Sequence, residues 1–227
     1  MTQPRTALVT GANRGLGRAT AELLHAMGLR TVVAARDPGE AAALAAELGR
    51  PAAWTGLDTT DADSVGAARD RIGPVDILVN NAGVLLDAGN NPLTAPMDSA
   101  LRTLEVNVLG TWRLSQAFVP AMMERGWGRV VMVSSGTGTF SHGLFTGAPA
   151  YSLSKTALNG LTTLLAAHTK GTGVLVNAVN PGPVRTRMMP RAERTPREAA
   201  EDIAGAATLP DDGPSGVLFK CGRISGW

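Results

Sequence analysis

Short runs rich in β-branched residues recur along this chain, and segments with helical periodicity separate them. Most of these runs are continuously apolar and do not alternate with polar residues, which is typical of strands covered on both faces of a sheet. The runs lie at residues 6–10, 30–35, 52–58, 75–80, 128–135, 173–179 and 216–221. Strands that alternate with helices in this way predict an α/β fold built on a parallel, doubly wound sheet.

The segments between the runs carry the apolar stripe of amphipathic helices. After the first run, Leu16, Leu23 and Met27 belong to a stripe with the i, i+3, i+4, i+7 spacing of a helix. Further helices are expected over 40–49, 62–72, 98–125 and 150–168. No linker rich in Pro, Gly or Ser interrupts the pattern, and 227 residues suit one domain with a sizeable core. The sequence therefore predicts a single domain over residues 1–227, with helices on both faces of the sheet.

Composition argues against several classes of function. The net charge is only +2 and no run of Lys or Arg occurs, so no nucleic-acid partner is expected. No apolar run reaches the length of about 18 residues that a membrane span needs, so no membrane partner is expected. A single cysteine, Cys221, allows no internal disulfide, and the first residues lack a signal-peptide pattern, which together favour a cytoplasmic location. No group of His, Cys, Asp and Glu has metal-ligand spacing, so no metal is expected.

A glycine-rich stretch, TGANRGLG at residues 10–17, follows the first strand and opens the first helix. Gly11, Gly15 and Gly17 permit a tight turn, and they let backbone N–H groups and a helix N-terminus approach a pyrophosphate. Their spacing is G-x-x-x-G-x-G, which differs from the general G-x-G-x-x-G dinucleotide fingerprint. A plain turn is the alternative, but the position between a strand and an amphipathic helix favours a dinucleotide site.

The end of the second strand indicates which dinucleotide is bound. An acidic residue at this point accepts a hydrogen bond from the adenine ribose of NAD. Here the strand is followed by Arg36 and then Asp37, and Arg14 lies within the glycine turn. Two guanidinium groups suit a 2′-phosphate, which predicts NADP(H). Two solvated arginines are the alternative, and Asp37 leaves NAD open.

The only tyrosine of the chain lies in YSLSK, residues 151–155. Tyr151 and Lys155 are four residues apart, which places them one turn apart on the same face of a helix. An ordinary surface pair has this spacing. So does a phenol whose pKa is lowered by roughly 1–3 units by a neighbouring ammonium group.

These motifs, taken with others in the same order, resemble the short-chain dehydrogenase/reductase family. The resemblance rests on TGANRGLG (10–17), LDTTD (57–61), NNAG (80–83), EVNVLG (105–110), VVMVSS (130–135), YSLSK (151–155) and NPGPVRT (180–186). Arg14, Arg36 and the C-terminal tail resemble the family's NADPH-dependent carbonyl-reductase-like members. The resemblance implies a Rossmann-like sheet with strand order 3-2-1-4-5-6-7, and the reduction of a small carbonyl compound by NADPH.

The family's catalytic group is Asn–Ser–Tyr–Lys, and its positions match Asn107, Ser135, Tyr151 and Lys155. By this resemblance Tyr151 is the general acid, while Lys155 lowers its pKa and binds the nicotinamide ribose. Ser135 is expected to hold the substrate oxygen, whereas Ser134 matches the family's first, structural serine. Asn107 is expected to bind a water that links the lysine to solvent, with a purely structural buried Asn as the alternative.

The remaining motif positions take cofactor roles through the same resemblance. Asp58 is expected to accept a hydrogen bond from the adenine amino group, and Thr186 to reach the nicotinamide carboxamide unless it is a simple loop residue. The complete expected cofactor set is Gly11, Asn13, Arg14, Gly15, Leu16, Gly17, Arg36, Asp58, Asn80, Ala82, Gly83, Tyr151, Lys155, Pro181, Gly182 and Thr186.

The spacer between the catalytic serine and tyrosine, residues 136–150, is fifteen residues long and longer than in many family members. We expect it to form a loop that borders the substrate. Its candidate lining residues are Phe140, His142, Leu144 and Phe145, and for His142 an exposed loop histidine is the favoured alternative. The methionines at 188–189 form either an apolar wall for the substrate or filler. Whether the chain is a homo-oligomer or a monomer stays open.

A different class of function is a catalytically silent NADP(H)-binding sensor or assembly protein on the same fold. The presence of all four catalytic residue types argues against it. A third reading, an epimerase- or dehydratase-like reaction, is disfavoured because such enzymes usually have longer chains with a substrate subdomain.

Overall fold

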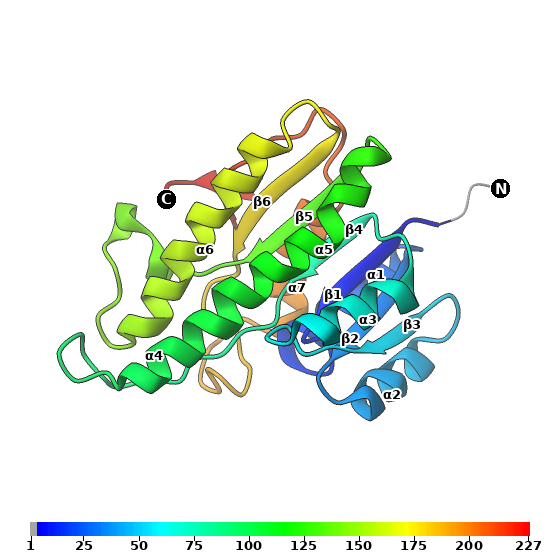
Figure 1. Ribbon diagram of the computed structural model, residues 1–227. Coiled ribbons are helices and arrows are strands. Elements are labelled where there is room, and N and C mark those ends of the chain that lie inside the picture. Colours follow the sequence, from blue (N-terminus) through cyan, green and yellow to red (C-terminus); the bar gives the residue numbers. More distant parts are fainter. Residues whose placement is uncertain (1–3) are drawn as a thin grey trace.

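The chain folds around one eight-stranded sheet with the order β3-β2-β1-β4-β5-β6-β7-β8 (Figure 1). The structure is a computed structural model and describes residues 4–227. The strands are β1 (Thr6–Thr10), β2 (Arg30–Ala35), β3 (Ala53–Gly56), β4 (Ile77–Asn80), β5 (Gly128–Val133), β6 (Val174–Asn180), β7 (Leu218–Lys220) and β8 (Arg223–Ser225). The first seven strands are parallel and follow the expected order, so the doubly wound α/β fold is confirmed.

The edge strand β8 was not expected, and it runs antiparallel to β7. Cys221 and Gly222 connect the two strands, and both have positive φ, 50° and 70°. Two central residues with positive φ form the tight turn that matches the twist of an antiparallel hairpin. The expected last strand, 216–221, therefore ends at Lys220, and the chain turns back on itself.

The helices form two layers, one on each face of the sheet (Figure 1). They are α1 (Gly15–Ala26), α2 (Pro38–Leu48), α3 (Ala62–Ile72), α4 (Met97–Leu104), α5 (Gly110–Glu124), α6 (Pro149–His168) and α7 (Pro196–Ala207). One buried cluster contains side chains of α3, α5 and α6, and the other contains side chains of α1, α2 and α7. Neighbouring strand residues divide between the two clusters: Leu8 belongs to the first and Val9 to the second, and both are fully buried. Continuous apolar runs are therefore covered on both faces, as expected.

Two helical segments differ from the sequence-based expectation. The segment 98–125 contains α4 and α5 separated by a π-helical turn, Glu105–Leu109. The other difference is α7, which begins with a capping box: Thr195 and Glu198 bind each other's backbone N–H groups, and Pro196 occupies the first turn. The sequence signature T-x-x-E with a following proline was present and would have predicted this helix start.

The parallel strands bring four loops to one edge of the sheet. The segments that follow β1, β4, β5 and β6 carry the glycine turn, NNAG, the two serines and NPGPVRT respectively. Ligands of such sheets bind outside the carboxyl ends of the strands, where the strand order reverses. Here that switch point lies between β1 and β4. Within residues 4–227, no helix is long and apolar enough to cross a membrane, and no group of three or more potential metal ligands occurs.

Candidate active site

The glycine turn between β1 and α1 requires glycine at three positions. Gly11 and Gly15 have φ of 62° and 54°, in the left-handed region that favours glycine. At Gly17 a Cβ atom would collide with the carbonyl oxygen of Gly11. Arg14 is the N-cap residue of α1, and its side chain forms no capping hydrogen bond with the first N–H groups of the helix. Such a turn fits a pyrophosphate.

Asn81, which was not among the expected residues, ties the glycine turn to the strand beside it. Its Nδ2 atom donates to the carbonyl oxygen of Thr10 at 2.8 Å. The backbone N–H groups of Asn81 and Ala82 both donate to Thr10 Oγ1 at 3.0 Å. Asn80, by contrast, points into the sheet, where its Nδ2 atom lies 3.2 Å from the sulfur of Met132. The structure therefore gives Asn80 a place in the central sheet, and Asn81 the contact with the turn.

The NNAG segment also reaches two of the expected catalytic residues, Asn107 and Lys155. A Cβ atom built on Gly11 would lie 3.1 Å from the Cα atom of Ala82. One built on Gly83 would lie 3.3 Å from Asn107 Oδ1 and 3.8 Å from Lys155 Nζ. Two neighbouring residues of one loop thus contact the glycine turn on one side and the Asn–Lys pair on the other.

Asn107 lies in the π-helical turn and is buried. Its Oδ1 atom accepts from the backbone N–H of Val84 at 2.8 Å, and its Nδ2 atom donates to the carbonyl oxygen of Val84 at 2.9 Å. Nδ2 also donates to Ser154 Oγ at 3.0 Å. The amide is therefore held by protein groups that fix the loop after NNAG, and π-helical turns are frequent at functional sites. The expected water-binding role of Asn107 stays a prediction.

Burial shifts the pKa values of Tyr151 and Lys155 in opposite directions. It raises the pKa of the Tyr151 phenol to about 12, although a hydrogen bond with Ser135 partly opposes the rise. It lowers the pKa of the Lys155 ammonium group to about 8. Lys155 Nζ donates to the carbonyl oxygen of Val133 at 2.8 Å and lies 5.4 Å from the centroid of the tyrosine ring. Burial dominates the shift at Tyr151, and the charge of Lys155 is not among its causes. The expectation that this lysine lowers the pKa of the tyrosine stays a prediction.

The two serines after β5 have separate surroundings. Ser134 is buried and donates to Asn159 Oδ1 at 2.5 Å, in agreement with a structural role. Ser135 is extended and partly exposed, and its Oγ atom accepts from the backbone N–H of Thr137 at 3.3 Å and from Thr137 Oγ1 at 3.0 Å. Thr137 was not expected at the site. A hydroxyl residue two positions after a serine is the local signal that points to such a turn.

Asp87 is a third residue that the sequence did not reveal. It is fully buried, and its carboxylate accepts from the backbone N–H of Ala150 at 2.6 Å and from that of Tyr151 at 3.3 Å. Ala148, at the N-cap of α6, has no capping side chain. The loop after β4 therefore caps the helix that carries the tyrosine. No local pattern indicates this contact, since the partners are more than 60 residues apart.

Arg14, within the glycine turn, and Arg36, directly after β2, are both exposed. Asp37 caps α2 through one carboxylate oxygen, Oδ1, which accepts from Gly39 N–H at 2.7 Å and Glu40 N–H at 3.3 Å. Glu40 also accepts from Asn13 Nδ2 at 2.5 Å, which links the turn to α2.

Asp58 follows β3 and lies near Arg36. Hydrogen bonds from the backbone and hydroxyl groups of Thr60 lower the pKa of its carboxyl group, and the positive charge of Arg36 adds to this effect. The residue is therefore ionised at neutral pH and ready to accept a hydrogen bond from a ligand.

The loop after β6 returns to the glycine turn. A Cβ atom built on Gly15 would lie 3.3 Å from Thr186 Cγ2, so Thr186 lies directly beside the turn. At the start of this loop, the N–H of Gly182 donates to Asn180 Oδ1 at 3.0 Å. Met188 and Met189 are half-exposed and border an open hollow of about 400 Å³.

The long spacer 136–150 also presents apolar side chains at the surface. Phe140 is 69% exposed and Phe145 is 54% exposed, so neither is part of the core. The backbone N–H of Phe145 donates to the carbonyl oxygen of Thr137 at 3.1 Å, which connects the spacer to the residue that holds Ser135. The side chain of His142 lies outside the part of the chain that the structure describes.

Known proteins are similar to this chain over most of its length. Residues 5–197 match the family model of short chain dehydrogenases. The 3-oxoacyl-[acyl-carrier-protein] reductase FabG of Vibrio harveyi is 35% identical over 218 residues, which cover 94% of this chain and 84% of the relative. Oxidoreductase UcpA of Salmonella typhimurium is 38% identical over 226 residues, which cover 96% of this chain and 79% of the relative.

Solved structures show the same similarity. A short chain dehydrogenase/reductase family protein has a TM-score of 0.87 and 31% identity, covering 95% of this chain and 94% of its own. A 3-oxoacyl-[acyl-carrier protein] reductase with bound NAD from Brucella melitensis has a TM-score of 0.85 and 28% identity, covering 95% of this chain and 88% of its own.

Proposed function

The chain belongs to the short-chain dehydrogenase/reductase family and is an oxidoreductase that uses a nicotinamide dinucleotide, and from this premise we propose that it transfers hydride from NADPH to a ketone, aldehyde or related carbonyl. The observation that carries the proposal is the double contact of NNAG. Ala82 lies against the glycine turn, and Gly83 lies against Asn107 and Lys155. This double contact supports a site in which the nucleotide and the proton-transfer groups lie within reach of each other.

In this proposal Tyr151 donates the proton to the carbonyl oxygen. Its pKa of about 12 keeps the phenol protonated at neutral pH, so the acid is present in the required form. Proton donation leaves a phenolate, and the adjacent Lys155 ammonium group stabilises that negative charge. Ser135, hydrogen-bonded to the phenol and held by Thr137, orients the substrate oxygen. Asn107 keeps the loop beside the lysine in place.

The proposed preference for NADPH rests on the adenine end of the site. Arg14 and Arg36 are available for a 2′-phosphate, whereas one oxygen of the Asp37 carboxylate, Oδ1, is engaged at the N-terminus of α2. Charge-assisted bonds from guanidinium groups to a phosphate are strong and geometrically specific. Equal affinity for NADH and NADPH in a titration would refute this preference.

The test is a turnover assay with purified protein, NADPH and a panel of carbonyl compounds, followed by nicotinamide absorbance. Thioesters of 3-oxoacyl chains belong in the panel, because a similar protein is named for that substrate. We expect Tyr151→Phe to lower turnover by roughly 10²–10⁴-fold, the usual contribution of one general acid, while NADPH affinity is retained. Full activity of Tyr151→Phe would remove the tyrosine from the mechanism. Tight NADPH binding without turnover of any carbonyl would support the silent sensor instead.

A further inference from the structure

We propose that Arg194 is a positioning residue that ties the neck of the loop between β6 and α7, residues 182–193, and so holds Thr186 at the glycine turn. The inference rests on the proposed function, because it concerns how the nicotinamide end of the site is kept closed. Arg194 lies outside every motif that the sequence analysis identified.

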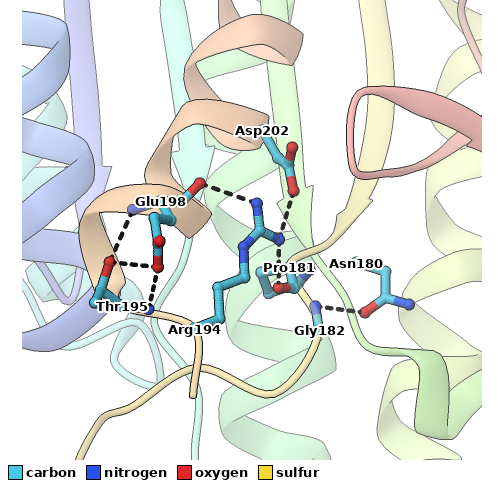
Figure 2. A network of polar contacts seen from close by, with 7 residues as sticks. All are labelled: Asn180, Pro181, Gly182, Arg194, Thr195, Glu198 and Asp202. Carbon is cyan, nitrogen blue, oxygen red and sulfur yellow. Dashed lines mark hydrogen bonds and ion pairs between the residues drawn. The ribbon is translucent and has the colours of Figure 1, made fainter. Parts of the chain in front are cut away.

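The guanidinium group of Arg194 joins both ends of the loop (Figure 2). Its Nη1 atom donates to the carbonyl oxygen of Pro181, at the start of the loop, at 2.8 Å. Its Nη2 atom donates to the carbonyl oxygen of Glu198, in the first turn of α7, at 2.9 Å. The ion pair with Asp202, one turn further along α7, measures 2.7 Å. A single side chain thus binds three groups on two segments.

The backbone of Arg194 also joins the two ends of this loop. Its carbonyl oxygen accepts from the N–H of Arg185 at 2.8 Å, and Val184 forms an isolated parallel β-bridge with Arg194. Thr186 directly follows Arg185 in the chain, and its side chain lies against Gly15. The position of Thr186 is therefore set one residue beyond a point that Arg194 fixes.

The helix that anchors Arg194 is firmly held. Its first turn is closed by the reciprocal bonds between Thr195 and Glu198 (Figure 2). Ala199, Ala200 and Ile203 of α7 are fully buried, and Ile203 belongs to the buried cluster that also contains side chains of α1 and α2. Arg194 thus connects a loop with exposed residues at its tip to a helix that is partly buried in the core.

Arginine suits this position for a chemical reason. The side chain of Asp202 is only 9% exposed, so its carboxylate needs a charged partner. Hydrogen bonding and charge from Asp202 raise the pKa of Arg194 although burial opposes the rise. A planar guanidinium group can donate in several fixed directions at once, whereas a lysine ammonium group acts as a compact point charge.

The experiment compares Arg194→Gln with Arg197→Gln in the full-length protein. Arg197 is exposed on the first turn of α7, and the structure gives its side chain no hydrogen bond or ion pair within residues 4–227. NADPH affinity is measured by fluorescence titration. Loop opening is measured by limited trypsin digestion, with mass spectrometry of cleavage after Arg187 and Arg191, both exposed within the loop.

We expect Arg194→Gln to raise the dissociation constant of NADPH about tenfold, which corresponds to about 1.4 kcal/mol. Cleavage after Arg187 and Arg191 is expected to accelerate by a similar factor, with kcat changing less than the KM for NADPH. Arg197→Gln is expected to match the wild type in both readouts. Should Arg194→Gln fail to fold, Asp202→Asn, which keeps the arginine but removes the ion pair, takes its place in the same comparison.

Two results would overturn the inference: affinity and cleavage equal to those of Arg197→Gln, or a uniform rise in cleavage along the whole chain, which would mean that Arg194 only stabilises the fold. Failure of the proposed function looks different, because the wild-type protein itself would then either bind no NADPH or bind it without reducing any carbonyl compound. In that case the cleavage after Arg187 and Arg191 still decides whether Arg194 holds the loop, and an unchanged rate refutes it.

Discussion

Burial of Lys155 links the active site to the stability of the protein. The pKa of this residue is about 8 in the folded protein, below its ordinary value of 10.5. Between these values the unfolded chain binds more protons than the folded protein, so the free energy of unfolding rises with pH. Tyr151 acts later, because its folded pKa of about 12 exceeds its ordinary value of 10.0. Between these two values the unfolded chain loses its proton first, and stability falls.

We therefore expect the contribution of these two groups to stability to increase from about pH 8 towards pH 10 and to decrease above it. Replacing Lys155 with Met should abolish the increase, because the buried ammonium group is removed. The measurement is urea unfolding at several pH values between 7 and 11. Lys170→Met, a change at an exposed lysine, is the matched control and should keep the increase. Parallel pH profiles for the wild type and Lys155→Met would refute the assignment.

For single residues, the sequence predicted which side chains lie at the site better than it predicted how buried they are and what they contact. Tyr151, Lys155, Ser135 and Asn107 lie together as the motifs predicted. The sign of the tyrosine pKa shift could not be predicted, because solvation depends on the packing of distant segments around the phenol. Asp87 was missed for the same reason, since a buried acid in a loop has no local pattern.

Among the elements, α6 depends most on a partner from elsewhere in the chain. Its first N–H groups are satisfied by Asp87 from the loop after β4, and Tyr151 lies in this first turn. We expect Asp87→Ala to lower the free energy of unfolding by about 1–3 kcal/mol, because a buried N–H group is left without an acceptor. We also expect kcat to fall by about 10–100-fold, since small displacements of a catalytic group are costly.

The readout that separates positioning from general destabilisation is cofactor binding. NADPH affinity of Asp87→Ala, measured below the unfolding temperature, should stay close to that of the wild type, because the glycine turn is not touched. Asp87→Asn keeps one acceptor oxygen and should recover part of kcat. Asp98→Ala, at the exposed start of α4, is the control and should change neither quantity much. A loss of kcat and affinity in equal measure would contradict the positioning role.

Helices and strands with strong patterns were predictable, and the irregular ones were not. The helix 62–72 has the bounds that its pattern indicated. The buried residues at and beside the π-helical turn Glu105–Leu109 are polar residues and glycine, among them Thr103, Asn107 and Gly110, so hydrophobic periodicity could not reveal the turn. The hairpin into β8 requires a positive φ at Cys221, a conformation that the identity of this residue does not suggest.

For the whole molecule, the order of the strands followed from the resemblance to the family. The contacts at the end of the sheet where β5 begins could not be predicted in this way. Arg129 lies at the start of β5, at the end of the sheet opposite the active site, and is 1% exposed. Its guanidinium group donates to the carbonyl oxygens of Leu209 at 2.9 Å and Gly128 at 2.8 Å. It also pairs with Asp211 at 2.7 Å and stacks 4.2 Å from the Trp127 ring.

Because Arg129→Met leaves the carbonyl groups of Leu209 and Gly128 without the donor that satisfies them, we expect it to lower the free energy of unfolding by about 3 kcal/mol. Asp211→Asn should cost much less, since the side chain of Asp211 is 82% exposed and its charge is solvated. Urea unfolding measures both. Turnover per folded molecule should be unchanged in both variants, because the active site lies beyond the other end of β5. Equal destabilisation by the two substitutions would show that the ion pair, and not the carbonyl contacts, holds this end of the sheet together.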